Sequence, residues 1–212
     1  MNILTIDTST NWTTLGIVKL DTDGHYNALV KEFSIDSCNQ IEQISSYVIN
    51  SVFDSELSLE NINAIVVGCG PGSFMELRLG ITSAKTLGHS LLIPVYGVCS
   101  LDSIGIQTIG NVLIIISSKS HKIYWALYNN KKRVYGPSMD KLHPILTSLN
   151  SSLVKVAGPL EYIFKYNLIP LKLKRSTSEG LIDSVISWTY PEKVIPIYLH
   201  HFDFKHHTVA HN

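Results

Sequence analysis

The sequence predicts an α/β fold made of two related units. Each half of the chain opens with three strand-like segments, and alternating strand and helix patterns follow in both halves. This order of patterns is typical of a mixed sheet with helices packed on it. The halves share too little sequence to count as a repeat, so the duplication is predicted for the architecture alone. We expect units at 1–109 and 110–199, followed by a histidine-rich, partly ordered tail at 200–212.

The first unit begins with three predicted strands, "NILTID" at 2–7, "WTTLGIVKL" at 12–20 and "ALVKEFSI" at 28–35. Polar turns separate them, which predicts an antiparallel meander. Apolar residues then recur every three or four positions between 39 and 53, which predicts an amphipathic helix. Its apolar face consists of Ile41, Ile44, Val48 and Val52.

A continuous apolar run, "INAIVVG" at 62–68, predicts a strand that is covered on both faces. A glycine-rich loop, a helix at 74–91, a strand at 93–98 and a short capped helix at 100–108 follow it. The second unit has similar patterns. We expect its strands at 111–117, 122–129, 133–136 and 153–158, and its helices at 139–149, 160–167 and 178–190.

Composition excludes some classes of protein. Lys plus Arg and Asp plus Glu both total 17, so the formal net charge is zero. Strong stand-alone binding to nucleic acid or to a membrane surface usually needs a basic excess. No apolar stretch approaches the roughly 20 residues that span a bilayer, and no basic segment precedes the first apolar run. Three distant cysteines without CxxC spacing argue against a disulfide framework or a thiolate zinc site. We therefore expect a cytoplasmic protein.

The glycine-rich loop "GCGPG" at 68–72 has two possible roles. Backbone N–H groups of Gly70 and Gly72, at the start of a helix, offer a place for a phosphate. The loop lacks the lysine and hydroxyl of a phosphate loop, and its proline removes one N–H donor. Ser73 and Glu76 have the spacing of a capping box, which favours a role in starting the helix.

Three small residues form a stripe along that helix: Gly80, Ala84 and Gly88 recur every four positions. Glycine inside a helix costs about 1 kcal/mol relative to alanine, so a compensating close contact is expected. The contact is either with the chain's own sheet or with a helix of a second subunit.

Four stretches together resemble the bacterial TsaB (YeaZ) family in order and spacing: "ILTIDTST" at 3–10, the segment 59–104, "IYWALY" at 123–128 and "PIYLH" at 196–200. The resemblance implies an actin/Hsp70/sugar-kinase-like (ASKHA, ribonuclease H-like) fold of two related subdomains, the second reduced. It also implies a non-catalytic subunit needed for threonylcarbamoyladenosine beside the tRNA anticodon. In that family TsaB pairs with the catalytic subunit TsaD, and a small ATPase, TsaE, joins them.

The resemblance also assigns roles to residues. It places the partner interface on the first two helices, and a homodimer through the same surface when the chain is alone. Carried onto this chain, the interface consists of Ile41, Ile44, Val48, Val52, Gly80, Ala84 and Gly88. Asp7 occupies the position where ATP-using relatives of the fold hold a metal–phosphate group, and we interpret it as a remnant. We expect no catalytic residue, no cofactor and no physiological metal site, since the HxxxH of His207 and His211 lies in the tail.

Some positions depart from the family pattern, and two other functions remain open. Met75 and Glu76 replace a small Thr-Gly pair after the loop. The main alternative function is an ATP-binding or hydrolysing enzyme with Asp7 and the Gly70–Gly72 loop on the phosphates. The basic runs "NKKR" at 130–133 and "KLKR" at 172–175 offer contacts to tRNA, which we expect only within a complex.

Overall fold

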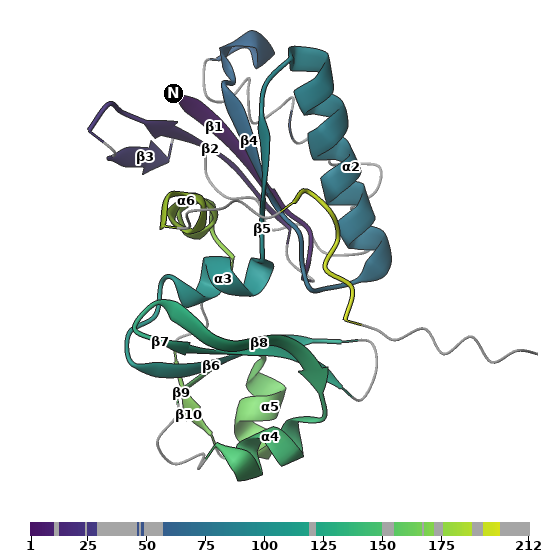
Figure 1. The fold of residues 1–212 in the computed structure, drawn as a ribbon, viewed down its shortest axis with the longest axis vertical. Coiled ribbons are helices and arrows are strands. Elements are labelled where there is room, and N and C mark those ends of the chain that lie inside the picture. The colour runs from purple at the N-terminus through teal and green to yellow at the C-terminus, as the bar shows by residue number, and fades with distance from the viewer. Residues whose placement is uncertain are drawn as a thin grey trace, which may run out of the picture.

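Two five-stranded sheets, stacked end to end, form the frame of the described part of the chain (Figure 1). The structure is a computed structural model. It describes residues 1–10, 13–23, 25–28, 46, 48, 57–118, 122–149, 155–166, 168–171, 176–187 and 193–199. Among these residues, none of the helices is both long and apolar enough to cross a membrane.

The first sheet has the strand order β3-β2-β1-β4-β5. Its strands are β1 (Asn2–Asp7), β2 (Thr14–Leu20), β3 (Tyr26–Ala28), β4 (Ala64–Gly68) and β5 (Val95–Val98). The strands β1, β2 and β3 form the antiparallel meander, whereas β4 and β5 run parallel to β1. All five residues of β4 are buried, as expected for a central parallel strand.

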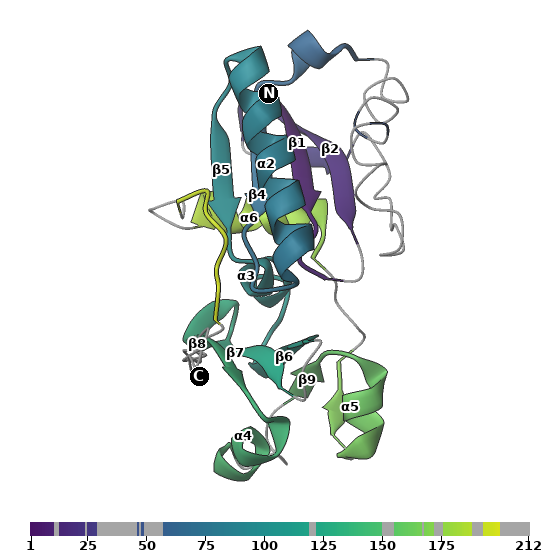
Figure 2. The ribbon, with the colours of Figure 1, turned by 90° about the vertical axis from the view of Figure 1, so that its right-hand side faces the viewer.

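Helices cover both faces of this sheet (Figures 1 and 2). Side chains alternate across a strand, so Leu4 and Ile6 of β1 share a core cluster with α2 (Phe74–Leu91). Ile3 packs instead with α6 (Ser178–Ser187) on the opposite face. A short 3-10 helix, η2 (Leu59–Asn61), precedes β4.

The second sheet has the order β10-β9-β6-β7-β8, which is the order of the first sheet read from the other edge. Its strands are β6 (Asn111–Ser117), β7 (Ile123–Asn129), β8 (Lys132–Asp140), β9 (Lys155–Ala157) and β10 (Ile169–Pro170). Here too an antiparallel meander is followed by two strands parallel to its first strand. The shared topology confirms the predicted duplication of architecture.

The second sheet is also covered on both faces. α3 (Ser100–Gly105) lies between the sheets, and its Leu101 and Ile104 pack on the same side of β6 as Val112. The helices α4 (Leu142–Ser148) and α5 (Leu160–Lys165) pack on the opposite face. Each sheet is therefore the middle layer of three layers.

Several element boundaries differ from the predictions. The strand predicted at 133–136 is longer, because the hairpin partner β7 pairs with β8 as far as Asp140. The helix predicted from residue 139 accordingly begins at Leu142. Of the predicted first helix, only Ser46 and Val48 are described, and both are helical. The third predicted strand, at 28–35, falls outside the described residues except for Ala28.

The chain crosses back from the second sheet to the first. The predicted boundary after residue 109 falls between the sheets, but α6, which lies in the range 110–199, packs on β1, β2 and β4. Farther on, the N–H of Ile197 donates to the Cys69 carbonyl at 2.8 Å. The helix α6 and Ile197 therefore take part in the unit built on the first sheet. The tail at 200–212 lies outside the described residues.

Candidate functional site

Asp7, at the carboxyl end of β1, lies between the two sheets and is enclosed by the chain itself. It is 1% exposed. Its Oδ1 accepts hydrogen bonds from the Ser9 N–H at 2.9 Å and the Ser100 hydroxyl at 3.1 Å, and its Oδ2 accepts one from the Ser176 hydroxyl at 2.7 Å. The Ser103 hydroxyl lies 2.7 Å from Ser176 Oγ and extends the network. A buried carboxylate needs such donors, and here it finds them within the chain.

Gly68, at the end of β4, borders this carboxylate. A Cβ atom at Gly68 would collide with the carboxyl group of Asp7, so the end of β4 lies directly against it. The segment leading into α6 is held beside it, because the Thr14 hydroxyl donates to the Ser176 carbonyl at 2.6 Å. Thr5 Oγ1 donates to Ser178 Oγ at 2.8 Å on the same side. Serine and threonine side chains therefore fill the junction between β1 and α6.

The glycine loop packs against this junction. The Gly70 N–H donates to Ser100 Oγ at 3.1 Å, and the Gly70 carbonyl accepts from the Ser100 N–H at 2.8 Å. Gly70 has a φ of 92°, a conformation that favours glycine. A Cβ at Gly72 would collide with the Ser9 backbone. The Gly70 N–H, a donor that the phosphate hypothesis requires, is already bonded to a side chain of α3.

The start of α2 differs from the predicted capping box. Ser73 is the N-cap residue, and its carbonyl accepts the Leu77 N–H at 2.9 Å, but its side chain makes no capping hydrogen bond. That part of the prediction is wrong. The first turn is held instead from the β1 side, where the Thr8 hydroxyl donates to the Glu76 carbonyl at 2.6 Å.

The small-residue stripe of α2 faces the chain's own sheet. A Cβ at Gly80 would collide with the Thr8 side chain, and one at Gly88 would collide with Val95 of β5. Ala84, between them, is fully buried in the core that α2 shares with the sheet. The assignment of these three residues to a partner interface is therefore corrected, because the chain's own sheet occupies the space beside them.

The first predicted helix is described at only one of its four interface positions. Val48 is 6% exposed and belongs to the same core as Ala84, so it also packs internally. The other three positions lie outside the described residues: Ile41, Ile44 and Val52.

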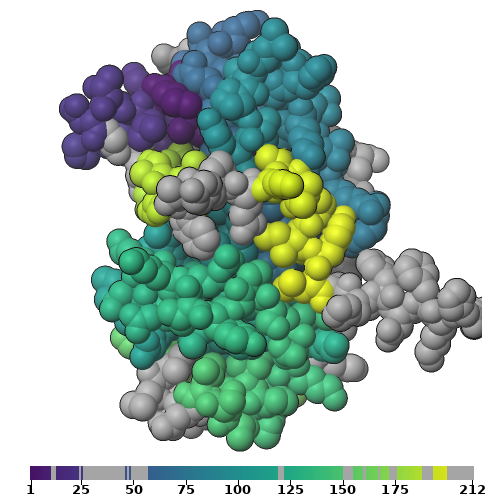
Figure 3. All heavy atoms as spheres, viewed as in Figure 1, coloured from purple at the N-terminus to yellow at the C-terminus, as the bar shows by residue number. Residues whose placement is uncertain are grey.

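The outward side of α2 carries an exposed cluster that the sequence analysis missed, which we call the Arg78 cluster: Phe74, Met75, Arg78 and Tyr198. The Arg78 guanidinium lies 3.8 Å from the Phe74 ring centroid, and its Nε donates to the Tyr198 hydroxyl at 2.9 Å. The two aromatic rings stack with centroids 5.2 Å apart. Met75 is 60% exposed. Figure 3 shows the segment that carries Tyr198, in yellow, lying on the surface beside α2. In the sequence, the four-residue spacing of Phe74 and Arg78 could have indicated that the two side chains meet on one face of the helix.

A second buried network fastens α3 to the second sheet. The Tyr128 hydroxyl donates to Asp102 Oδ1 at 2.6 Å, and Arg133 forms an ion pair with Asp102 Oδ2 at 3.1 Å. Burial, and next the Asp102 charge, raise the pKa of Tyr128 far above its ordinary value. Arg133 belongs to the run "NKKR", so one of the charges considered for tRNA is used internally. The run "KLKR" lies outside the described residues.

Within the described ranges, no group of three or more His, Cys, Asp or Glu residues is placed to hold a metal ion. His207 and His211 fall outside these ranges.

The duplicated sheets, each between helical layers, define an actin/Hsp70/sugar-kinase-like α/β protein. The family model described as TsaD: tRNA N6-adenosine threonylcarbamoyltransferase matches residues 35–183. An uncharacterized protein of Mycobacterium tuberculosis is 35% identical over 203 residues, which cover 96% of this chain and 93% of that relative. The tRNA threonylcarbamoyladenosine biosynthesis protein TsaB of Bacillus subtilis is 33% identical over 138 residues, covering 62% of this chain and 56% of that protein.

The structural comparison agrees with the sequence comparison. The solved structure of YeaZ from Pseudomonas aeruginosa matches with a TM-score of 0.74 and 18% identity, covering 93% of this chain and 100% of that chain. The chain belongs to the TsaB (YeaZ) family, as its sequence motifs indicated, and the predicted fold class is confirmed. An uncharacterized Mycobacterium leprae relative, 36% identical over 96% of this chain, is matched over 56% of its own length.

Proposed function

We propose that the chain is a non-catalytic subunit in threonylcarbamoyladenosine biosynthesis that binds and supports a TsaD-like catalytic subunit. Two relatives, from Bacillus subtilis and Escherichia coli, carry the name tRNA threonylcarbamoyladenosine biosynthesis protein TsaB. The observation that carries the proposal is the enclosure of Asp7. Its carboxylate is engaged by Ser9, Ser100 and Ser176, so it is not presented to a metal or a phosphate.

The Arg78 cluster supports a docking role for the outward side of α2. Phe74 is 37% exposed and Tyr198 is 39% exposed, although both rings are already ordered by stacking. Arginine and aromatic side chains are enriched among the residues that dominate binding energy at interfaces. Because Arg78 is held by the Phe74 ring face and by the Tyr198 hydroxyl, little side-chain entropy is lost when a partner covers it. The TsaD-like subunit docks on this cluster, and a second copy of the chain occupies it when that subunit is absent.

Reconstitution tests the proposed function. tRNA, the threonylcarbamoyl donor, the TsaD-like protein of the same organism and its TsaE-like ATPase are incubated with and without the chain. The threonylcarbamoyladenosine content of the tRNA is then measured by mass spectrometry. The proposal predicts modification that depends on the chain and that the chain without the TsaD-like protein cannot supply. Equal modification in its absence would refute the proposal.

The alternative function, an ATP-using enzyme, would require Asp7 and Gly70 to bind a metal ion and a phosphate. Both residues would have to exchange their present partners for these ligands. Calorimetric titration of the isolated chain with ATP and Mg²⁺ tests this. Under our proposal any heat of ATP binding should be the same for the native chain and Asp7→Asn, whereas micromolar affinity that Asp7→Asn abolishes would support the alternative.

A further inference from the structure

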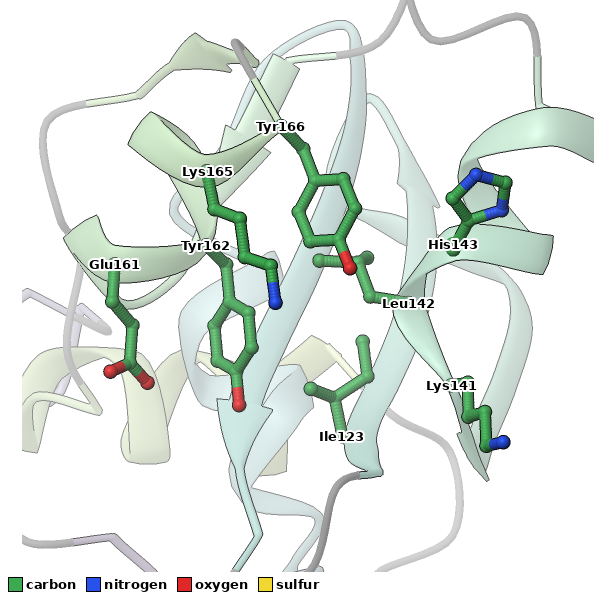
Figure 4. A pocket seen from close by; sticks show the side chains of 8 residues that line it. All are labelled: Ile123, Lys141, Leu142, His143, Glu161, Tyr162, Lys165 and Tyr166. Atoms are coloured by element: carbon green, nitrogen blue, oxygen red, sulfur yellow. The ribbon is translucent and has the colours of Figure 1, made fainter.

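A pocket of about 370 Å³ opens at the far end of the second sheet, between α4, α5 and the start of β7 (Figure 4). This volume falls within the range of small-molecule sites. The helices α4 and α5, which contribute lining residues to the pocket, lie away from α2 in both ribbon views (Figures 1 and 2). A ligand in this pocket is therefore independent of the proposed docking of a TsaD-like subunit.

The floor of the pocket is apolar and fixed by the core. Ile123 is 1% exposed and Leu142 is 4% exposed, and both belong to the cluster between the second sheet and its helices. Tyr162 and Tyr166 of α5 pack against that cluster and line one side of the pocket. Their rings are thus held in place by side chains that serve the core. Such a site needs little rearrangement when a ligand enters.

The Lys165 ammonium group extends over this floor (Figure 4). Lys165 and Tyr162 extend from α5 over the same space, while Lys141 and His143 line the α4 side, with the Lys141 ammonium directed outward (Figure 4). Lys165 Nζ lies 5.5 Å from the Tyr166 ring centroid. No carboxylate in the described part of the chain forms an ion pair with either lysine.

The polar groups near the rings favour an anionic ligand. The pKa of Tyr162 is raised, chiefly by burial and further by the neighbouring Glu161 charge, while a hydrogen bond with Ser117 acts in the opposite direction; the hydroxyl keeps its proton. The Glu161 carboxylate lies beside Tyr162, on the side of that ring away from Lys165 (Figure 4). The His143 ring meets the Tyr166 ring edge-on, with centroids 6.4 Å apart. Cations and a phenol hydroxyl therefore surround a flat apolar floor.

We propose that this pocket binds a nucleotide. A base stacks on the tyrosine rings over the apolar floor, and its phosphate is held by Lys165, with the exposed Lys141 side chain at the rim turning toward it on binding. Base–aromatic stacking is a recurring means of holding nucleotides, and lysine binds phosphate as a point charge. The same chemistry is offered by a free nucleoside monophosphate and by one nucleotide of an RNA strand.

Calorimetry of the full chain with AMP, adenosine, inorganic phosphate and a short oligoadenylate tests the proposal. AMP is expected to bind at least about tenfold more tightly than adenosine or phosphate alone, because the ring and charge contacts both contribute. Oligoadenylate binding without AMP binding would assign the pocket to an RNA strand. Equal affinity for phosphate and AMP would remove the stacking half of the proposal and overturn it.

Variants locate the binding. Lys141→Ala with Lys165→Ala should weaken AMP at least about tenfold, since two charge-assisted contacts are lost. Lys165→Arg should retain binding, and Lys132→Ala, on an exposed lysine of β8 within "NKKR", is the matched control. All of these lysines are exposed, so the variants should stay folded, which thermal unfolding checks. Binding that survives the double variant but falls in Lys132→Ala would overturn the assignment to this pocket.

Discussion

The two sheets share one topology but differ at their carboxyl ends. In the first sheet, β1 ends at Asp7, which hydroxyl groups from α3 and the start of α6 enclose. In the second sheet, the equivalent strand β6 ends at the half-buried Ser117, which pairs with Ile123 at the floor of the open pocket. Duplication of a topology thus does not duplicate a site, because the side chains at the strand ends decide what is closed and what is open.

The two units also differ in how a helix residue packs on its sheet: Ala84 of α2 is buried, whereas Phe164 of α5 is exposed. Substitution by tryptophan at each position tests this difference. Ala84→Trp forces a large ring between α2 and the first sheet, where no space exists. The free energy of unfolding should fall by about 3 kcal/mol or more, because overpacking displaces the surrounding core. Denaturant unfolding measures it. Phe164→Trp on α5, at a position 77% exposed, is the counterpart in the second unit and should change stability by less than about 0.5 kcal/mol.

The ends of β1 and β6 can be compared directly. Asp7→Ala leaves several buried donors without an acceptor, so the free energy of unfolding should fall by about 2–3 kcal/mol. Ser117→Ala, at the end of β6, should cost less than about 1 kcal/mol. Urea titrations of both variants check this. Equal effects would mean that the Asp7 network contributes no special stability to the junction.

Tyr128→Phe probes the second network, which joins α3 to the second sheet. Removing the donor to the buried Asp102 should cost about 1–2 kcal/mol. Tyr135→Phe, on an exposed ring of the same sheet, should cost less than about 0.5 kcal/mol. Thermal unfolding at neutral pH compares the two variants.

The raised pKa of Tyr128 predicts that the folded protein loses stability at high pH. The pKa of its phenol is raised in the folded state, so the folded protein keeps a proton that the unfolded chain loses above about pH 10. The contribution is complete below that pH and is lost as the pH rises beyond it. The free energy of unfolding is measured between pH 9 and pH 11, roughly one unit on either side of the ordinary tyrosine pKa. Its decline with rising pH should be smaller for Tyr128→Phe than for the native chain. An unchanged decline would contradict the buried hydrogen bond.

Local patterns predicted most of the frame, because strand and helix periods depend on near neighbours. The run at 62–68 became β4, and the four-residue spacing in α2 correctly indicated a close contact. The identity of that contact was not predictable, since Thr8 and Val95 come from other elements. Ser176 lies 169 residues from Asp7, and Tyr198 lies 120 residues from Arg78. No local period reports such pairs, so the enclosed carboxylate and the Arg78 cluster required the fold.

The central claim is that the outward side of α2, and not its small-residue stripe, meets a TsaD-like subunit. Size-exclusion chromatography of mixtures with the TsaD-like protein of the same organism tests it most directly. The native chain should co-elute. The double variant Met75→Asp, Arg78→Ala should remain folded, losing less than about 1 kcal/mol of stability from the exposed cation–π contact, yet elute separately.

Ile109→Asp is the matched control, because Ile109 is 76% exposed and lies outside α2. This control variant should still co-elute with the TsaD-like protein. A double variant that stays folded and still co-elutes would contradict the account and move the interface away from the Arg78 cluster.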